Sequence, residues 1–122
     1  MHQMHLAREL EQWLQGLRAS DEFIIVEGKK DKEALEKQGI TNIQILNKKP
    51  LYQLVEDLSS ERKNVVILTD LDRKGRELYG KLNNGLKKHG VKVNDKPRNF
   101  LFKRTKLRQI EGLTSYMQTI LQ

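Results

Sequence analysis

The chain has 122 residues, a hydrophobic content of 37%, and a formal net charge of +7 from 23 Lys and Arg against 16 Asp and Glu. This length is typical of one domain, and no stretch reaches the roughly 20 apolar residues that a membrane-spanning helix needs. The absence of Cys excludes a disulfide framework, a thiolate nucleophile and a thiolate zinc site. Because the N-terminus also lacks the basic and then apolar layout of a signal peptide, we expect a cytoplasmic protein without a membrane partner.

The excess positive charge lies in the second half of the chain. Residues 1–60 carry a net charge of −2 and residues 61–122 carry +9. The segment 81–110 alone has a net charge of +9. A basic region of this density attracts polyanions, because phosphates that bind to it release condensed counterions. The distribution therefore indicates contact with nucleic acid, although a lysine-rich surface that only keeps a protein soluble has the same composition.

The first predicted element is an amphipathic helix over residues 4–18, where apolar side chains such as Leu10 and Leu14 recur at spacings of three and four. A polar break follows the helix. We expect residues 1–20 to be an N-terminal helical extension and residues 21–122 to form the main part of what is overall a single domain.

Strands and helices then alternate. The apolar run Phe-Ile-Ile-Val at 23–26 predicts a strand buried on both faces, and a charged helix follows from about 30 to 38, with Gly39 at its end. Residues 43–46 predict a second strand, and Pro50 suits the first turn of a helix that runs to about residue 58.

The third strand, at 65–68, is the clearest buried strand in the chain, and a helix over 73–88 follows it. Residues 91–93 begin either a fourth strand or a loop that leads to the Phe-Leu-Phe run at 100–102. Strands that alternate with helices of this length indicate βαβ units, a parallel sheet and right-handed crossovers. The predicted fold class is therefore α/β.

The Phe-Leu-Phe run at 100–102 has two interpretations. Aromatic side chains among basic residues are typical of a stacking surface for single-stranded nucleic acid, but a strand with one buried face shows the same alternation. A last helix is predicted over 107–121, where Gly112 is unfavourable. Glu111 and Gly112 form a second Glu-Gly pair, but no buried strand precedes them, so we assign them no function.

Acidic residues follow two of the predicted strands. Glu27 comes directly after the first strand, and Asp70 and Asp72 come shortly after the third. Ligands of open parallel sheets bind at the carboxyl ends of strands, so we expect these side chains to face one crevice. On extended backbone the two Asp side chains share one side of the strand, where a cation relieves their repulsion. Mg²⁺ or Mn²⁺ suits such oxygen ligands, with Glu27 as a third ligand or as the group that moves a proton.

These acidic residues also have a purely structural interpretation. Asp72 is placed to be the N-cap of the helix that starts at residue 73, and Asp31 is placed in the first turn of the helix after the first strand, where an acid interacts favourably with the helix dipole. The occurrence of acids after two buried strands of one small α/β domain favours the metal site.

The two segments resemble the signature of the Toprim domain family, which is found in primases, topoisomerases, several nucleases and a ribosomal-RNA maturation nuclease. The family pattern is an apolar strand ending in Glu-Gly, often with an Asp shortly after, and a later apolar strand ending in Asp-x-Asp, frequently followed by Gly. The matching residues here are Glu27, Gly28, Asp31, Asp70, Asp72 and Gly75. The resemblance extends over residues 22–105 and is nearest to the maturation nuclease and to small stand-alone Toprim proteins.

The resemblance implies a Rossmann-like fold with about four parallel strands between helices. It also implies that Mg²⁺ binds through Asp70 and Asp72, that Glu27 acts in acid–base phosphoryl chemistry, and that Gly28 and Gly75 lie where backbone must pass closely. One departure is the Asn-Lys-Lys-Pro sequence at 47–50, where the family often has a small or Gly-containing turn; Lys48 and Lys49 either hold phosphate or are solvated.

The remaining site residues are a supporting acid and basic side chains that are expected to contact phosphates. The acid is Asp31, and the basic residues are Lys29, Lys30, Arg73, Lys74, Lys103 and Arg104.

The leading functional hypothesis is a Mg²⁺-dependent nuclease that acts on RNA or DNA and resembles the ribosomal-RNA maturation enzyme, with a protein partner as a possible source of substrate specificity. The main alternative is a non-catalytic nucleic-acid-binding module or subunit of a larger complex. A receiver-type phosphoryl-transfer domain fits the length, but receivers have an acidic pair after the first strand, where this chain has Glu27 and Gly28. A haloacid-dehalogenase-type phosphatase also has Asp-x-Asp, but Lys74 stands where those enzymes have Thr.

Overall fold

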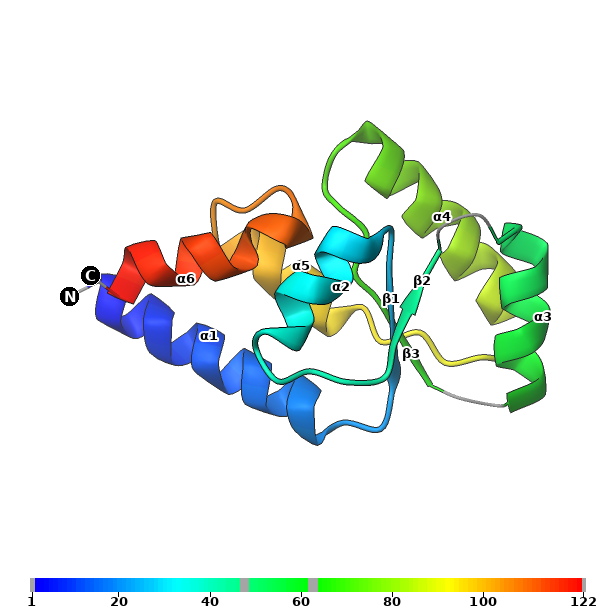
Figure 1. Cartoon of the computed structure of the whole chain (residues 1–122). Helices are drawn as coiled ribbons and strands as arrows, with labels where there is room; N and C mark the ends of the chain where they lie inside the picture. Colours follow the sequence, from blue (N-terminus) through cyan, green and yellow to red (C-terminus); the bar gives the residue numbers. More distant parts are fainter. Residues whose placement is uncertain (1, 47–48, 62–63, 122) are drawn as a thin grey trace.

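The computed structural model describes residues 2–46, 49–61 and 64–121. Three short strands alternate with helices along the chain, and further helices follow the last strand (Figure 1). The elements are α1 (His2–Ala19), β1 (Phe23–Val26), α2 (Lys29–Glu36), β2 (Ile43–Ile45), α3 (Leu51–Glu61), β3 (Val65–Ile67), α4 (Arg73–Lys88), α5 (Lys96–Arg104), the 3-10 turn η1 (Ile110–Gly112) and α6 (Leu113–Leu121).

The strands form a parallel sheet in the order β2-β1-β3. In the register of this sheet, Ile24 of the central strand lies between Ile43 and Val66. The predicted α/β class, with a parallel sheet between helices and an N-terminal helix, is confirmed, although the sheet of the described residues has three strands and not about four. At 91–93 the structure has only a single parallel bridge between Val65 and Val93, because the chain soon turns into α5, whose first turn contains a proline.

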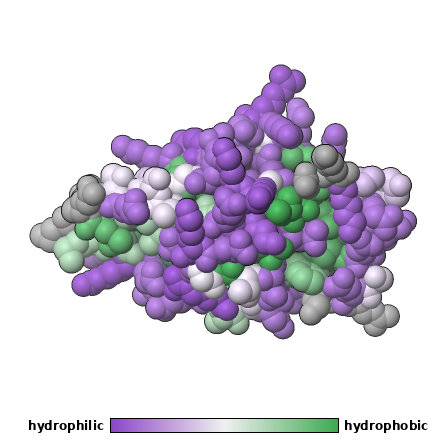
Figure 2. Space-filling model, in the orientation of Figure 1, coloured by the Kyte–Doolittle hydropathy of each residue, from purple (hydrophilic) through white to green (hydrophobic). Residues whose placement is uncertain are grey.

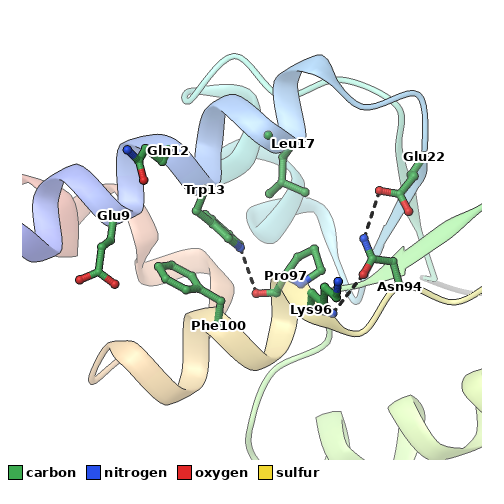
Figure 3. A pocket seen from close by; sticks show the side chains of 10 residues that line it. Glu9, Gln12, Trp13, Leu17, Glu22, Asn94, Lys96, Pro97 and Phe100 are labelled. Carbon is green, nitrogen blue, oxygen red and sulfur yellow. Dashed lines mark hydrogen bonds between the residues drawn. The ribbon is translucent and has the colours of Figure 1, made fainter.

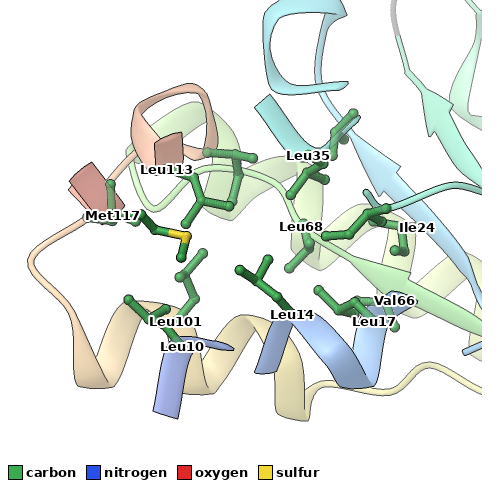
Figure 4. Packing of buried hydrophobic residues seen from close by; sticks show 14 of the residues in the cluster. Leu10, Leu14, Leu17, Ile24, Leu35, Val66, Leu68, Leu101, Leu113 and Met117 are labelled. Atoms are coloured by element: carbon green, nitrogen blue, oxygen red, sulfur yellow. The ribbon is translucent and has the colours of Figure 1, made fainter. Parts of the chain in front are cut away.

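The sheet separates two apolar clusters, as expected for strands buried on both faces. Ile24 of β1 faces the cluster formed with α1, α2, α5 and α6, whereas Ile25 faces the cluster formed with α3 and α4. Figure 1 shows the same three layers, with α3 and α4 on one side of the strands and the remaining helices on the other. Leu14 of α1 lies in the middle of the first cluster (Figure 4) and has no exposed surface.

Residues 100–102 belong to α5, so the prediction of a half-buried strand there is wrong. Leu101 is fully buried, Phe100 stacks on Trp13 with ring centroids 6.2 Å apart, and Trp13 Nε1 donates a hydrogen bond to the carbonyl of Pro97 at 3.0 Å (Figure 3). The aromatic side chains therefore hold α5 against the rest of the protein, and the aromatic–basic alternation reflects one helix with a packed face and an exposed face.

The helix predicted over 107–121 is shorter than expected, because η1 precedes α6 and regular helix begins only at Leu113. The preceding loop returns to the carboxyl edge of the sheet, where the Leu71 N–H donates to the Arg108 carbonyl at 2.8 Å. This return brings η1 beside the residues that follow β3.

The surface in view is largely hydrophilic, with apolar residues in small separate areas (Figure 2). Within the described part of the chain, we find no helix with both the length and the apolar character to cross a membrane.

Replacing Leu14 by Ala is expected to lower the free energy of unfolding by about 2–5 kcal/mol, because it opens a cavity in the larger cluster. The matched control is Leu121→Ala in α6, where the side chain is 67% exposed and the change should stay within about 0.5 kcal/mol. Urea unfolding measures both, and equal effects would contradict the assignment of this core.

Candidate functional site

The side chains singled out by the sequence gather at the carboxyl edge of the sheet, around a cavity of about 340 Å³. We call it the acidic cavity. It is lined by Glu27, Gly28, Lys29, Lys30, Asp31, Asp70, Lys74 and Glu111. Four carboxylates and three ammonium groups therefore share one small space, which is the composition expected of a site for a cation and an anionic ligand.

Asp70 is the centre of this arrangement. Its backbone N–H donates to Glu27 Oε2 at 2.7 Å, which ties the end of β1 to the segment after β3. Its own carboxylate accepts a hydrogen bond from the Ile110 N–H at 2.8 Å through Oδ1. Residues from two strand ends and from η1 are thus joined directly at one aspartate.

Burial and neighbouring charges raise the pKa of Asp70 from 3.8 to about 6. Loss of hydration is the larger cause, and repulsion from Asp31, Glu27 and Asp72 adds to it, while the Ile110 hydrogen bond acts in the opposite direction. The ionised form of Asp70 is therefore disfavoured in this environment, and a bound cation would stabilise it.

Asp31 forms the wall of the cavity at the start of α2 and is only 7% exposed. Its Oδ2 accepts from the Gly28 N–H at 3.1 Å, so it satisfies one of the free donors at the helix N-terminus. Burial raises its pKa, and repulsion from Glu27 and Glu111 contributes, whereas hydrogen bonds from the Gly28 and Glu111 backbone lower it.

Asp72 has the structural role that the alternative interpretation gave it, that of a helix N-cap. It is the N-cap of α4, and its Oδ1 accepts from the Gly75 N–H at 2.8 Å. The extended geometry assumed for Asp70 and Asp72 is not present, because β3 ends at Ile67 and residues 71–72 form a bend. Asp72 does not line the acidic cavity, although it is near enough to influence the pKa of Asp70.

Gly75 lies where backbone segments pass very closely. A Cβ atom placed on Gly75 would stand 2.0 Å from the Asp70 carbonyl oxygen, a separation that no side chain tolerates. Thr69 reinforces this contact, since its hydroxyl donates to the Gly75 carbonyl at 2.7 Å. Gly28 differs: its backbone is extended and a Cβ there would meet nothing within 4 Å, so the expected close approach is not found within the chain.

Arg98 is a component of the site that the sequence did not reveal. Its side chain is buried, Nε donates to the Thr69 carbonyl at 3.0 Å, and Nη2 donates to the Asp70 carbonyl at 2.7 Å. The guanidinium lies over the rings of Tyr79 at 4.7 Å and Phe102 at 5.2 Å. A buried cation therefore sits behind Asp70, held by backbone carbonyls and aromatic faces. Its pKa is lowered by burial, and Asp70 and Glu27 act against this shift.

Glu111 is the second residue that sequence reasoning missed. It lines the acidic cavity from η1, and its backbone donates to the carboxylate of Asp31. Glu111 lies there because the chain returns to the carboxyl edge of the sheet after α5. In the sequence, only the Glu-Gly pair at 111–112 pointed to a possible role for this residue.

The predicted phosphate-contacting residues fall into two groups. Lys29, Lys30 and Lys74 line the acidic cavity. The others lie apart from its lining: Arg73 is exposed and pairs with Glu77, while Arg104 forms a bidentate ion pair with Glu9 of α1 at 2.7 and 3.0 Å.

Two further lysines complete this account. Lys103 is exposed in the last turn of α5. Lys49 pairs with Asp57, whereas Lys48 lies outside the described residues.

The donor set fits a hard divalent ion in its chemistry. Every acid around the cavity offers carboxylate oxygens, which Mg²⁺ and Mn²⁺ prefer. Burial first, and then repulsion from neighbouring carboxylates, raises the pKa of Asp70, and a cation would stabilise its ionised form. In residues 2–46, 49–61 and 64–121, however, no group of three or more His, Asp or Glu side chains is arranged as a ready metal site. The carboxylates would have to move closer together than they are here in order to bind one ion.

A larger cavity of about 490 Å³ lies between α1 and the start of α5, beside Trp13, Pro97 and Phe100 (Figure 3). One of its lining residues, Glu22, directly precedes β1, whereas Glu27 follows that strand; five residues of extended chain place the two ends about 16 Å apart. Its lining is mainly apolar and contains no carboxylate cluster, in contrast to the acidic cavity at the other end of the strands.

The parallel α/β sheet with Glu-Gly and Asp-x-Asp at its carboxyl edge defines a Toprim domain. Residues 22–96 match the Toprim domain family, and the chain belongs to that family rather than to the receiver or haloacid dehalogenase classes. Toprim domains are metal-binding domains of nucleases and primases; they typically bind a divalent metal such as Mg²⁺ and generally act on nucleic acids.

Among known proteins, the chain is similar to UPF0292 proteins of archaea. It is 40% identical over 105 residues to the UPF0292 protein MJ1624 of Methanocaldococcus jannaschii, a match that covers 83% of this chain and 82% of that protein. A UPF0292 protein of Pyrococcus abyssi is 45% identical over 86 residues, which cover 70% of this chain and 64% of that relative. A solved structure described as a putative protein from Aquifex aeolicus superposes with a TM-score of 0.78 and 35% identity, over 84% of this chain and 95% of that one.

Replacing Gly75 by Ala is expected to destabilise the protein by about 2–4 kcal/mol, because the new methyl group would force the Asp70 backbone to move. Gly80→Ala is the matched control in the same helix: a Cβ at Gly80 meets nothing within 4 Å, and the change should stabilise α4 by about 0.5–1 kcal/mol. Thermal unfolding distinguishes the two signs, and a neutral Gly75→Ala would show that the close approach is not required.

Replacing Asp70 by Asn should stabilise the metal-free protein at high pH. The folded state raises the pKa of Asp70 to about 6, so it binds more protons than the unfolded state, and the stability of the wild type falls as pH rises from about 4 to 6. Asn has no charge and keeps an acceptor for the Ile110 N–H. After allowance for partial exposure, we expect a gain of about 1–2 kcal/mol at pH 8 that disappears below about pH 4.

The measurement is thermal unfolding in EDTA from pH 4 to 8. Asp57→Asn is the control with the opposite expectation, because hydrogen bonding to Lys49 lowers the pKa of Asp57 and the loss of its charge should give no gain at pH 8. A stability difference between Asp70→Asn and the wild type that is independent of pH would contradict the assigned environment of Asp70.

Proposed function

We propose that this protein is a Mg²⁺-dependent phosphodiesterase acting on nucleic acid, most simply a nuclease, with Mn²⁺ as an alternative ion. The observation that carries the proposal is the acidic cavity, where Glu27, Asp31, Asp70 and Glu111 face Lys29, Lys30 and Lys74 at the carboxyl edge of a Toprim sheet. Carboxylates suit a divalent cation, and ammonium groups beside them suit the phosphate that such a cation also binds.

Asp70 and Glu27 in the lining of the cavity, together with Asp72 beside Asp70, are the residues that would hold the ion. Each has one carboxylate oxygen in a hydrogen bond, to Ile110, Asp70 and Gly75 respectively, and in the described part of the chain no hydrogen bond is made by the other oxygen. Bound there, Mg²⁺ would supply positive charge for a phosphodiester and lower the pKa of a coordinated water.

Side chains of the protein would perform the other steps, which are proton transfer and the orientation of the phosphate. Glu27 lies in the cavity wall, where its carboxylate would accept or return the proton of the attacking or leaving oxygen. Lys29, Lys30 and Lys74 would orient the phosphate through ammonium hydrogen bonds. Arg98 would keep the Asp70 peptide in place through its two hydrogen bonds to backbone carbonyls.

A second candidate is a non-catalytic nucleic-acid-binding module, alone or as a subunit beside a protein partner. The observation in its favour is that Glu27, Asp70 and Asp72 all form hydrogen bonds that fix the fold, and that the carboxylates of the described residues do not form a ready three-ligand group. Such a protein would bind RNA or DNA in a salt-dependent way without cleaving it.

Cleavage of structured RNA and of DNA by the purified protein, with Mg²⁺, with Mn²⁺ or with EDTA, tests the proposal. We expect metal-dependent cleavage by the wild type, and a loss of at least about 100-fold in Asp70→Asn and Glu27→Gln, in line with the usual size of acid–base contributions. Asp57→Asn, on the far side of the sheet, should cleave at the wild-type rate. Equal cleavage by all four proteins would refute the site, and salt-dependent binding without cleavage would favour the second candidate.

A further inference from the structure

A second groove, of about 690 Å³, begins where the acidic cavity ends and shares Lys30 and Glu111 with it. We call it the α2–α6 groove. One wall is a face of α2 with Lys30, Glu33 and the C-cap residue Lys37, and the opposite wall is formed by the segment around η1 and by α6. The surface over α2 is hydrophilic (Figure 2).

The α6 wall consists of uncharged side chains that can form hydrogen bonds. Ser115 and Gln118 are exposed there, one turn apart, and neither side chain is hydrogen-bonded in the part of the chain that the structure describes. Thr114 lies beside them and accepts a long hydrogen bond, 3.5 Å, from Gln38. Hydroxyl and amide groups of this kind contact the phosphate and sugar oxygens of nucleic acids.

The formal charges of the residues that line the groove cancel. Lys30 and Lys37 are seven residues apart, which places them on the same face of α2 about 10 Å from one another, but Glu33 and Glu111 lie in the same lining. Among the described residues that line the groove, none is aromatic, so it offers no platform for base stacking. A ligand would therefore be held by directed hydrogen bonds to its backbone rather than by net charge or by its bases.

We infer that the α2–α6 groove binds one strand of a nucleic acid as that strand leaves the acidic cavity, through contacts of Ser115 and Gln118 to its sugar–phosphate backbone. The inference rests on the proposed function, because the acidic cavity is what places a phosphodiester at the entrance of the groove. Recognition of this kind is independent of base sequence.

The groove also assigns a function to the C-terminal part of the chain. The Toprim match ends at residue 96, whereas the wall that carries Ser115 and Gln118 lies beyond it. The helix α6 would thus extend the substrate surface of the domain, in addition to packing against α1 through residues such as Met117.

The test is the binding of a fluorescein-labelled 20-nucleotide single strand of mixed sequence, as RNA and as DNA, to the full chain in EDTA, measured by anisotropy at 50 and 200 mM salt. Ser115→Ala/Gln118→Ala is expected to raise Kd about fivefold at both salt concentrations, because uncharged contacts release no counterions. Lys37→Ala should instead reduce the dependence of Kd on salt.

A matched pair of variants separates position from net charge. Ser115→Glu/Gln118→Glu and Gln12→Glu/Gln15→Glu both lower the net charge by two, the first within the groove and the second on exposed positions of α1. We expect the groove variant to raise Kd by tenfold or more and the α1 variant by no more than about threefold.

The outcomes distinguish this inference from the proposed function. If the groove and α1 variants bind equally while the wild type cleaves with Mg²⁺, the groove inference is wrong and the nuclease proposal stands. If only the groove variant loses binding and no protein cleaves, the inference stands and the protein is a binding module. If the wild type binds neither the RNA nor the DNA strand, the groove inference is wrong, and the nuclease proposal is decided by the cleavage test alone.

Discussion

The arrangement of the site depends on how the peptide of Asp70 is held. Its N–H donates to Glu27, its carbonyl accepts from Arg98, and its carboxylate accepts from the backbone of Ile110, at 2.7, 2.7 and 2.8 Å. Gly75 packs against the same carbonyl with no room for a side chain. Because one residue joins β1, α4, α5 and η1, a shift of any of these elements would displace a carboxylate of the acidic cavity.

The charged groups around the Asp70 peptide partly compensate one another. Four carboxylates at one edge repel one another, and burial adds to the cost of ionising Asp70 and Asp31. The guanidinium of Arg98 partly offsets this repulsion from the inner side, without an ion pair to any of the four. On the outer side, the lysines of the cavity leave space that an anionic ligand and its counter-ion can enter. The guanidinium of Arg98 stays in place, whereas the ions and ligands beside the cavity lysines can exchange. This combination suits a surface that must bind and release a polyanion.

Much of the fold could be predicted from the sequence, because short buried strands and amphipathic helices have distinct apolar periods. The strand at 23–26 and the helix at 73–88 agree with the structure residue for residue. The C-terminal third was harder, because residues 100–102 alternate like a strand. In the structure Phe100 stacks on Trp13 of α1, and Phe102 lies under Arg98, four residues earlier in the same helix. Pro97 in the first turn was the local signal that favoured helix.

The site was predictable to the same extent. Glu27, Asp31 and Asp70 follow buried strands, and such positions meet at one edge of any parallel sheet. Glu111 and Arg98 reach that edge through the path of the chain after β3, which no local pattern encodes. Asp72 shows the limit of spacing arguments, since the Asp-x-Asp spacing is compatible both with two ligands on a strand and with one acid followed by a helix cap.

The single tryptophan of the chain lies far from the acidic cavity, and this has a practical consequence. Trp13 stacks on Phe100 and bonds to Pro97, so its fluorescence reports whether α1 is docked on α5. Circular dichroism reports the helices of the whole chain. Coincidence of the two signals during unfolding would mean that the N-terminal helix and the Toprim region melt as one cooperative unit, whereas an earlier change in fluorescence would identify α1 as a separately detachable segment.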